Sequence, residues 1–168
     1  GLVAGACFAD TRNTVVCVDK DAKKIGKLLK GEIPIYEPGL ENLVSRGVEQ
    51  GRLKFTQSTQ DAVRDSEVIF MAVGTPPTAS GDPDLSFLKA AAEEVGRAMD
   101  GYRLVVNKST VPIGTHAQVA QWISSQTRHP VDVVSNPEFL KEGTAVDDFL
   151  KPDRVVIGTK SKAVYDKM

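Results

Sequence analysis

Short runs of β-branched and apolar residues alternate with segments of helical periodicity along the whole chain, and no other feature of the sequence constrains its fold as strongly. The apolar runs predict strands at residues 14–19, 53–56, 67–73, 102–107, 131–135 and 154–157. The segments between them predict helices at residues 2–9, 21–29, 40–51, 58–65, 85–99, 117–123 and 144–150, with Gly31 ending the second. This order is typical of an α/β fold with a doubly wound, mostly parallel sheet.

Polar residues and Gly/Pro turns follow four of the predicted strands. They are Asp19, Gly74-Thr75, Lys108-Ser109-Thr110 and Asn136-Pro137-Glu138. In doubly wound sheets, ligands bind beyond the carboxyl ends of the strands. We therefore expect these four ends to converge on one crevice.

Composition excludes several function classes. The 21 Lys and Arg nearly balance the 22 Asp and Glu, whereas a nucleic-acid-binding domain normally has a basic excess. The longest apolar runs are far shorter than the roughly 20 residues that a membrane-spanning helix needs. The two cysteines and two histidines lack metal-ligand spacing, and no secretory signal opens the chain. We expect no nucleic-acid or membrane partner, no metal site, and a reducing cytoplasmic setting in which Cys7 and Cys17 are buried free thiols.

Asp19 is the first candidate for cofactor binding. A carboxylate at the end of the second strand of a nucleotide-binding unit can accept both hydroxyls of an adenine ribose, about 20 residues after a Gly-rich turn. Gly1 stands eighteen positions before Asp19 and fits the last glycine of that turn. The carboxylate would repel a 2′-phosphate, which favours NAD over NADP, and Lys24 could face the same ribose. From spacing alone, a mere cap for the following helix is an equally good interpretation of Asp19.

Small hydroxyl residues follow two other strands, beside prolines that fix the turns. Thr75 lies in one such turn, and Ser109 and Thr110 lie in the other. Hydroxyls and free backbone amides at these places suit a pyrophosphate, a ribose or a bound water. Each turn alone also fits ordinary turn chemistry, so it is their shared location that points to function.

The stretch NPEFLKEG at residues 136–143 carries two carboxylates. Glu138 and Glu142 are four residues apart, so on a helical turn both would face the same way, and one could act as a general base beside a cofactor. Two solvated carboxylates on a surface turn are the commoner outcome for such spacing. We also expect Cys7 and Cys17 to be inert core residues, because both lie in apolar segments.

Five motifs together resemble the UDP-glucose 6-dehydrogenase family, within the UDP-glucose/GDP-mannose dehydrogenases. They are GLVAGACFA at residues 1–9, GEIPIYEPGL at 31–40, VGTPP at 73–77, KSTVPIG at 108–114 and SNPEFLKEGTA at 135–145. The resemblance covers the chain in order and at family spacing. It implies a Rossmann-like NAD-binding domain over residues 1–168, and Gly143 resembles the UDP-glucose branch more closely.

The resemblance implies a cytosolic enzyme that oxidises C6 of UDP-glucose to a carboxylate in two NAD-dependent steps through a cysteine thioester. Asp19 and Lys24 would then hold the adenosine ribose, and Thr75 and Ser109 would line the NAD site. Thr110 would position a water, Glu138 would be the general base, and Glu142 would lie near the nicotinamide. Phe139, Leu140 and Lys141, with both glutamates, would border the sugar nucleotide.

The chain departs from the family pattern at both ends. The nucleophilic cysteine belongs to a C-terminal domain after Met168, and neither cysteine of this chain matches it. The first strand and two glycines of the phosphate turn would precede Gly1, where the sequence begins without Met. We therefore expect a fragment that is inactive by itself. The parent enzyme would form homo-oligomers through a central helix absent here.

Other functions remain open on the sequence alone. The same chemistry could act on GDP-mannose or a UDP-N-acetylhexosamine, because sugar specificity lies mostly in the missing part. A β-hydroxyacid dehydrogenase shares the fold class but does not need the two acids of residues 136–143. A non-catalytic NAD-binding module is the alternative from a different class.

Overall fold

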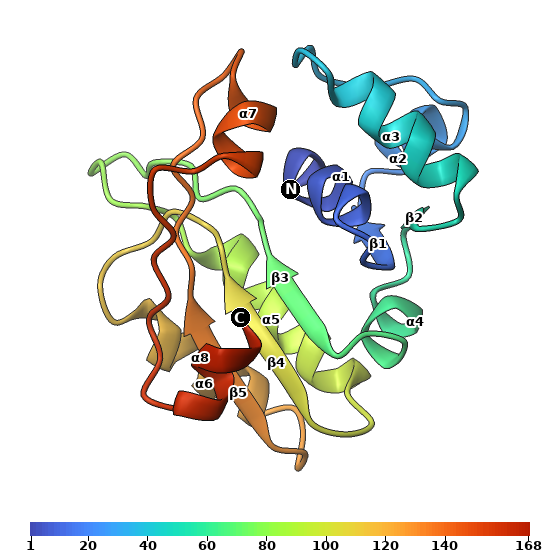
Figure 1. Ribbon diagram of the computed structural model, residues 1–168. Coiled ribbons are helices and arrows are strands. Elements are labelled where there is room, and N and C mark those ends of the chain that lie inside the picture. The colour runs from blue at the N-terminus through green and yellow to red at the C-terminus, as the bar shows by residue number, and fades with distance from the viewer. The chain divides into compact units, whose positions relative to one another are not determined.

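The computed structural model describes residues 1–168 and confirms the predicted α/β class, with helices alternating with parallel strands (Figure 1). The helices are α1 (Leu2–Asp10), α2 (Ala22–Leu29), α3 (Leu40–Glu49), α4 (Thr59–Arg64), α5 (Ser86–Ala98), α6 (Thr115–Ser124), α7 (Ala145–Leu150) and α8 (Lys162–Lys167). The strands are β1 (Val15–Val18), β2 (Leu53–Thr56), β3 (Val68–Met71), β4 (Arg103–Asn107) and β5 (Val131–Ser135). No helix has the length and apolar character that a membrane crossing requires.

The strands form two parallel sheets. One contains β1 and β2, and the other contains three strands in the order β3-β4-β5. The single sheet that we predicted is therefore divided, because no strand of this chain pairs with both β1 and β3. Taken separately, the first sheet matches the pair 3-2 and the second the run 4-5-6 of the doubly wound order 3-2-1-4-5-6.

The chain divides into two units, which are described separately. Unit 1 comprises residues 1–58 and 139–154, and unit 2 comprises residues 59–138 and 155–168. Unit 1 is thus built from two segments that lie far apart in the sequence.

The core of unit 1 joins α1, α3 and α7 with the β1-β2 sheet. Helix α1 approaches β1 closely at Gly5, where a Cβ atom would lie 2.5 Å from the Sγ atom of Cys17. Phe149 of α7 meets Phe8 of α1 edge to face, with 5.0 Å between the ring centroids. The small residues of α1 are what allow this close packing on the sheet.

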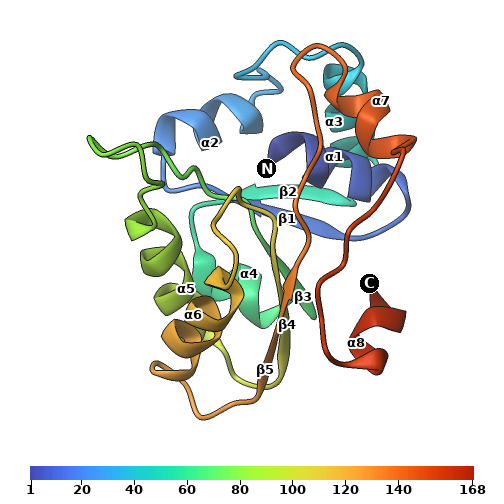
Figure 2. The same ribbon diagram turned by 90° about the vertical axis from the view of Figure 1, so that its left-hand side faces the viewer.

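In unit 2, helices cover both faces of the β3-β4-β5 sheet (Figure 2). Val105 packs with residues of α5 and α6 on one face, whereas Leu104 and Val106 pack with Val164 of α8 on the other. This arrangement follows from the alternation of side chains along a strand. The predicted site residues of this unit follow the carboxyl ends of the three strands.

The prediction of a strand at residues 154–157 is wrong. This segment is not regular, and a single antiparallel bridge joins Gly158 to Ser135 at the edge of the sheet. Val155 and Val156 are 63% and 41% exposed, so their β-branched side chains do not enter a core. A run of β-branched residues predicts a strand only where a neighbouring strand offers its backbone.

Candidate active site at the ends of the strands

Ser109 ties the end of β4 to the end of β3. Its hydroxyl accepts a hydrogen bond from the Val73 N–H (3.0 Å) and lies 2.8 Å from the Val73 carbonyl, to which it donates. The backbone N–H groups of Lys108 and Ser109 both donate to the Met71 carbonyl, at 2.9 and 3.1 Å. The hydroxyl that we predicted to line the NAD site therefore shapes the turn that carries Thr75.

Thr75 and Thr110 are brought together by the turns after β3 and β4. The Thr75 hydroxyl donates to the Thr110 carbonyl at 2.7 Å. Both residues line an open hollow, whose other walls come from Pro77, Gly81, Pro83 and Val111. Thr110 is exposed, and its role in positioning a water stays a prediction.

Lys108 and Glu138 form an ion pair that sequence analysis did not predict. The Nζ atom of Lys108 lies 3.8 Å from the Oε2 atom of Glu138. The Lys108 side chain is 7% exposed and that of Glu138 is 36% exposed. The sequence marks Lys108 only as part of a polar strand end. Lysine side chains are almost always exposed, and no local sequence pattern predicts that one is buried.

The Asn136 backbone fixes the start of the segment that carries Glu138. Its N–H donates to the Asn107 carbonyl at 2.9 Å, and its side-chain amide donates to the Val156 carbonyl at 2.9 Å. Pro137 follows and restricts φ. Glu138 is thus held within unit 2, one residue after a restrained proline.

Asp19 lies directly after β1 in unit 1. Its Oδ1 atom accepts a hydrogen bond from the Asp21 N–H at 2.9 Å, and its Oδ2 atom lies 3.4 Å from the Lys24 Nζ atom. The cap of α2 is Asp21, whose Oδ1 accepts from the N–H groups of Lys23 and Lys24. The hydrogen bond from Lys24, and then that from Lys23, lowers the Asp21 pKa.

The residues around Asp19 are chemically suited to an adenosine ribose. Asp21 performs the capping, so the helix cap does not account for the Asp19 carboxylate. The Asp19 side chain is 42% exposed and keeps acceptor capacity for ribose hydroxyls. In the same unit, Gly1 caps α1, and its carbonyl accepts from the Gly5 N–H at 3.0 Å.

Glu37 organises the segment that we expect to border the substrate. Its carboxylate, 9% exposed, accepts from the Gly143 N–H (2.9 Å) and the Ala145 N–H (2.8 Å) at the start of α7. Gly143 has φ of 87°, a conformation that a residue with a Cβ atom rarely adopts. These bonds link motifs more than a hundred residues apart, and no local pattern predicts them.

Residues 138–142 form no helix, so their spacing does not place Glu138 and Glu142 on a common helical face. The physical reason is that carboxylates compete for the backbone donors. The Lys141 N–H donates to Asp148 at 2.9 Å, and this bond is the main cause that lowers the Asp148 pKa. The N–H groups of Gly143 and Ala145 donate to Glu37, whereas that of Thr144 donates to the Lys141 carbonyl.

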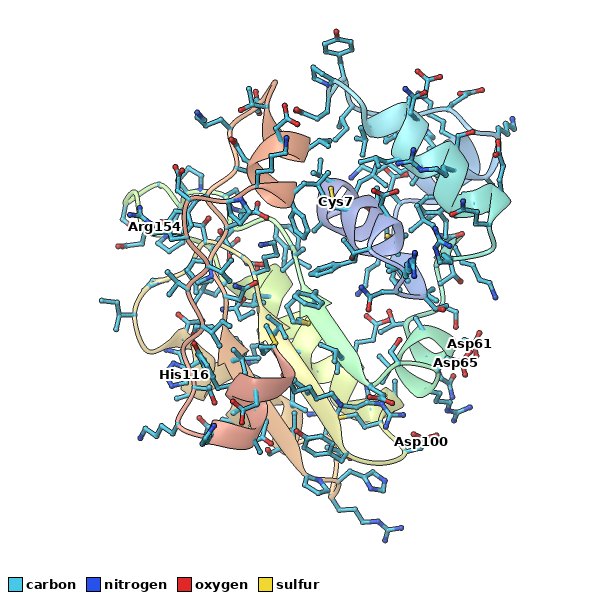
Figure 3. All side chains as sticks on the ribbon, in the orientation of Figure 1. Cys7, Asp61, Asp65, Asp100, His116 and Arg154 are labelled. Atoms are coloured by element: carbon cyan, nitrogen blue, oxygen red, sulfur yellow. The ribbon has the colours of Figure 1, made fainter.

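The residues between the two glutamates differ in exposure. Phe139 is half exposed, with the Arg154 guanidinium 4.8 Å from its ring centroid (Arg154 is labelled in Figure 3). Leu140 packs partly against the core of unit 1, whereas Lys141 and Glu142 are exposed. Within unit 1, this segment presents one aromatic ring and two charged side chains.

Both cysteines are free, and their surroundings make them poor nucleophiles. Cys7 is fully buried on α1 (Figure 3) and Cys17 is partly buried on β1. Burial raises the pKa of each thiol to about 11. Thiolates are the reactive form of cysteine, so the prediction of inert thiols agrees with the structure.

The chain is similar to nucleotide-sugar dehydrogenases over its whole length. Residues 1–168 match the family described as UDP-glucose/GDP-mannose dehydrogenase family, NAD binding domain. The UDP-glucose 6-dehydrogenase of Rhizobium meliloti is 53% identical over 160 residues, which are 94% of this chain and 37% of that protein. UDP-glucose 6-dehydrogenase TuaD of Bacillus subtilis is 50% identical over 163 residues, 96% of this chain and 35% of that protein.

Solved structures agree with the fold. A UDP-glucose dehydrogenase from Pyrobaculum islandicum superposes with a TM-score of 0.96 at 41% identity, covering 99% of this chain and 40% of the other. A GDP-mannose dehydrogenase from Pseudomonas aeruginosa superposes with a TM-score of 0.95 at 36% identity and the same coverage. The chain thus spans little more than a third of the length of these curated relatives.

Proposed function

Because the chain belongs to the UDP-glucose/GDP-mannose dehydrogenase family, whose NAD-binding domain it matches from residue 1 to residue 168, we propose that it is the NAD-binding part of a UDP-glucose 6-dehydrogenase. The observation that supports UDP-glucose as the substrate is the sequence identity of 49–53% with three UDP-glucose 6-dehydrogenases. We further propose the cytoplasmic location and homo-oligomeric parent that the family implies.

The proposed reaction converts the C6 alcohol of UDP-glucose to a carboxylate, using one water and two NAD. When bound, NAD supplies the hydride acceptor for each oxidation. A cysteine outside this chain forms the thioester between the steps, and water releases the acid from it. The residues of this chain bind and orient the reactants and move protons.

Asp19, with Lys24 beside it, holds the ribose hydroxyls, and Gly1 at the start of α1 lies near the pyrophosphate. The support is the accessible carboxylate at a strand end and the separate helix cap at Asp21. Thr75 and Ser109 line the NAD site through the turn that their hydrogen bonds fix.

Thr110 and Glu138 carry the chemistry assigned to this chain. Thr110 positions the attacking water through its exposed hydroxyl, and the Glu138 carboxylate accepts the proton. Glu142 lies near the nicotinamide, and Phe139, Leu140 and Lys141 border the sugar nucleotide. The support is that Asp148 holds the Lys141 N–H and Glu37 holds the Gly143 N–H, and that Phe139, Lys141 and Glu142 are exposed.

The deciding experiment measures NADH released per UDP-glucose consumed by the complete protein, read from its own start codon to its own stop codon. Two NADH per sugar are expected, and Glu138→Gln and Thr110→Ala should lower kcat. One NADH would instead indicate a simple alcohol dehydrogenase.

A panel of sugar nucleotides separates the alternatives. The likeness to a GDP-mannose dehydrogenase structure favours GDP-mannose as the second substrate to test, followed by the UDP-N-acetylhexosamines. Turnover of one of these in place of UDP-glucose would identify it as the substrate, and the proposed reaction and family would stay the same. No NADH with any sugar nucleotide would leave a non-catalytic NAD-binding module.

A further inference from the structure

Lys108 is a buried cation at the carboxyl end of the unit 2 sheet. It follows β4 directly, and its side chain is 7% exposed. Its backbone N–H is fixed by the Met71 carbonyl. An ammonium group withdrawn from water in this way needs a compensating partner.

Glu138 is the charged partner that the structure provides. The 3.8 Å between Nζ and Oε2 is within ion-pair range, and the low exposure of Lys108 reduces solvent screening on its side of the pair. Desolvation lowers the pKa of Lys108, and the Glu138 carboxylate opposes this shift. Glu138 reaches towards solvent while Lys108 does not, which leaves the carboxylate available to a ligand.

Other charged groups on the surrounding elements have partners of their own. These pairs are Asp132 of β5 with Tyr102, Glu67 beside β3 with Lys167 of α8, and Lys162 with Asp166 on α8. Lys108 is therefore the nearby cation that acts on Glu138 from the strand ends of this unit.

We propose that Lys108 is a positioning residue for Glu138, holding its carboxylate in place through their ion pair. The inference rests on the proposed function, because that function makes Glu138 the base. In this role Lys108 touches neither substrate nor cofactor. It acts through the carboxylate, whose position the buried charge fixes.

The test compares kcat and KM for UDP-glucose oxidation by the complete protein and three variants. Lys108→Met keeps the apolar stem and removes the charge, whereas Lys108→Arg keeps the charge. Lys89→Met is the matched control, because Lys89 is also in an ion pair, with Glu93 at 3.9 Å, but is exposed on α5. Lys108→Met should lower kcat about tenfold or more with KM nearly unchanged, because the base is no longer held in place. Lys108→Arg and Lys89→Met should leave kcat near the wild-type value.

A second readout is independent of turnover. In substrate-free protein, ¹³C NMR follows the resonance of the Glu138 carboxyl, assigned by its loss in Glu138→Gln. A changed chemical shift in Lys108→Met that is restored in Lys108→Arg supports the pairing even if UDP-glucose is not the substrate. An unchanged carboxyl resonance, or a raised KM with kcat unchanged, would overturn the inference while leaving two NADH per sugar as support for the proposed function.

Discussion

Glu37 illustrates how a single carboxylate can organise a site from a distance. It accepts two backbone hydrogen bonds at the start of α7 and is nearly buried. The substitution Glu37→Gln keeps one acceptor oxygen but turns an NH₂ group towards a backbone N–H. We expect a loss of about 1–3 kcal/mol in unfolding free energy, together with a raised KM for UDP-glucose.

Urea unfolding and steady-state kinetics of the complete protein check this prediction. Glu41→Gln is the matched control, because Glu41 is an exposed glutamate in the first turn of α3, four residues further on. It should behave nearly as the wild type. Equal stability of the two variants would remove Glu37 from its proposed organising role.

The buried thiols predict a loss of stability in alkali. The pKa of Cys7 is about 11 in the folded chain, against 9.0 for an ordinary cysteine. Because the folded state favours the protonated thiol, its stabilising contribution is complete below about pH 9 and is lost as the pH rises towards 11. Cys17 acts in the same direction, and Tyr102, whose pKa is raised to about 12, adds to it at still higher pH.

Cys7→Ala should therefore reduce the slope of the melting temperature against pH in this alkaline range. The comparison uses the slope, since the absolute melting temperature also falls when the buried Sγ atom is removed. An identical slope in variant and wild type would show that Cys7 does not carry this pH dependence.

At the scale of elements, α5 and α6 pack closely at Gly96. A Cβ atom at this position would lie 2.6 Å from the Ile123 carbonyl oxygen and 2.9 Å from the Gln126 Cβ atom. Backbone cannot yield as a flexible side chain does, so Gly96→Ala should destabilise the protein by about 1–3 kcal/mol.

Gly26→Ala on α2 is the opposite case. Nothing lies within 4 Å of its Cβ position, so the variant gains helix propensity and should be more stable by about 0.5–1 kcal/mol. Denaturant unfolding of both variants measures the two changes in unfolding free energy, which should have opposite signs. A stabilised Gly96→Ala variant would contradict the packing of the two helices.

Elements with a strong local signal were predicted within a few residues, including α5 from its three- and four-residue apolar spacing and Gly31 after α2. The prediction of a strand at residues 154–157 failed although the local pattern is typical of a strand. Only Gly158 of this region pairs with the edge strand of the sheet. Helix α8 was not predicted, since six residues give little periodicity. The strand ends of the candidate site followed from topology, whereas Lys108 and Glu37 depend on contacts that no local pattern contains.

At the scale of the whole molecule, the chain carries the proposed cofactor-binding residues but lacks the proposed nucleophile. We expect residues 1–168 alone to form no NADH from NAD and UDP-glucose, because the family pattern places the nucleophilic cysteine and most contacts to the sugar nucleotide outside these residues. Absorbance of NADH measures this, with the complete protein as the positive control. Sustained turnover by the 168 residues would refute the assignment of the nucleophile.

The discontinuity of unit 1 has a consequence for the chain as the ribosome makes it. Residues 1–58 emerge first, but Ala145, Val146 and Phe149, which complete their core, are about 90 residues away. At about 5–20 residues per second, the first segment waits roughly 5–20 s for its partner. Throughout that interval its apolar surface is exposed, while nearly all of unit 2 is synthesised. Synthesis therefore favours assembly of unit 2 around its local β-α-β contacts before unit 1 closes, and chaperone binding to the nascent chain should concentrate on residues 1–58.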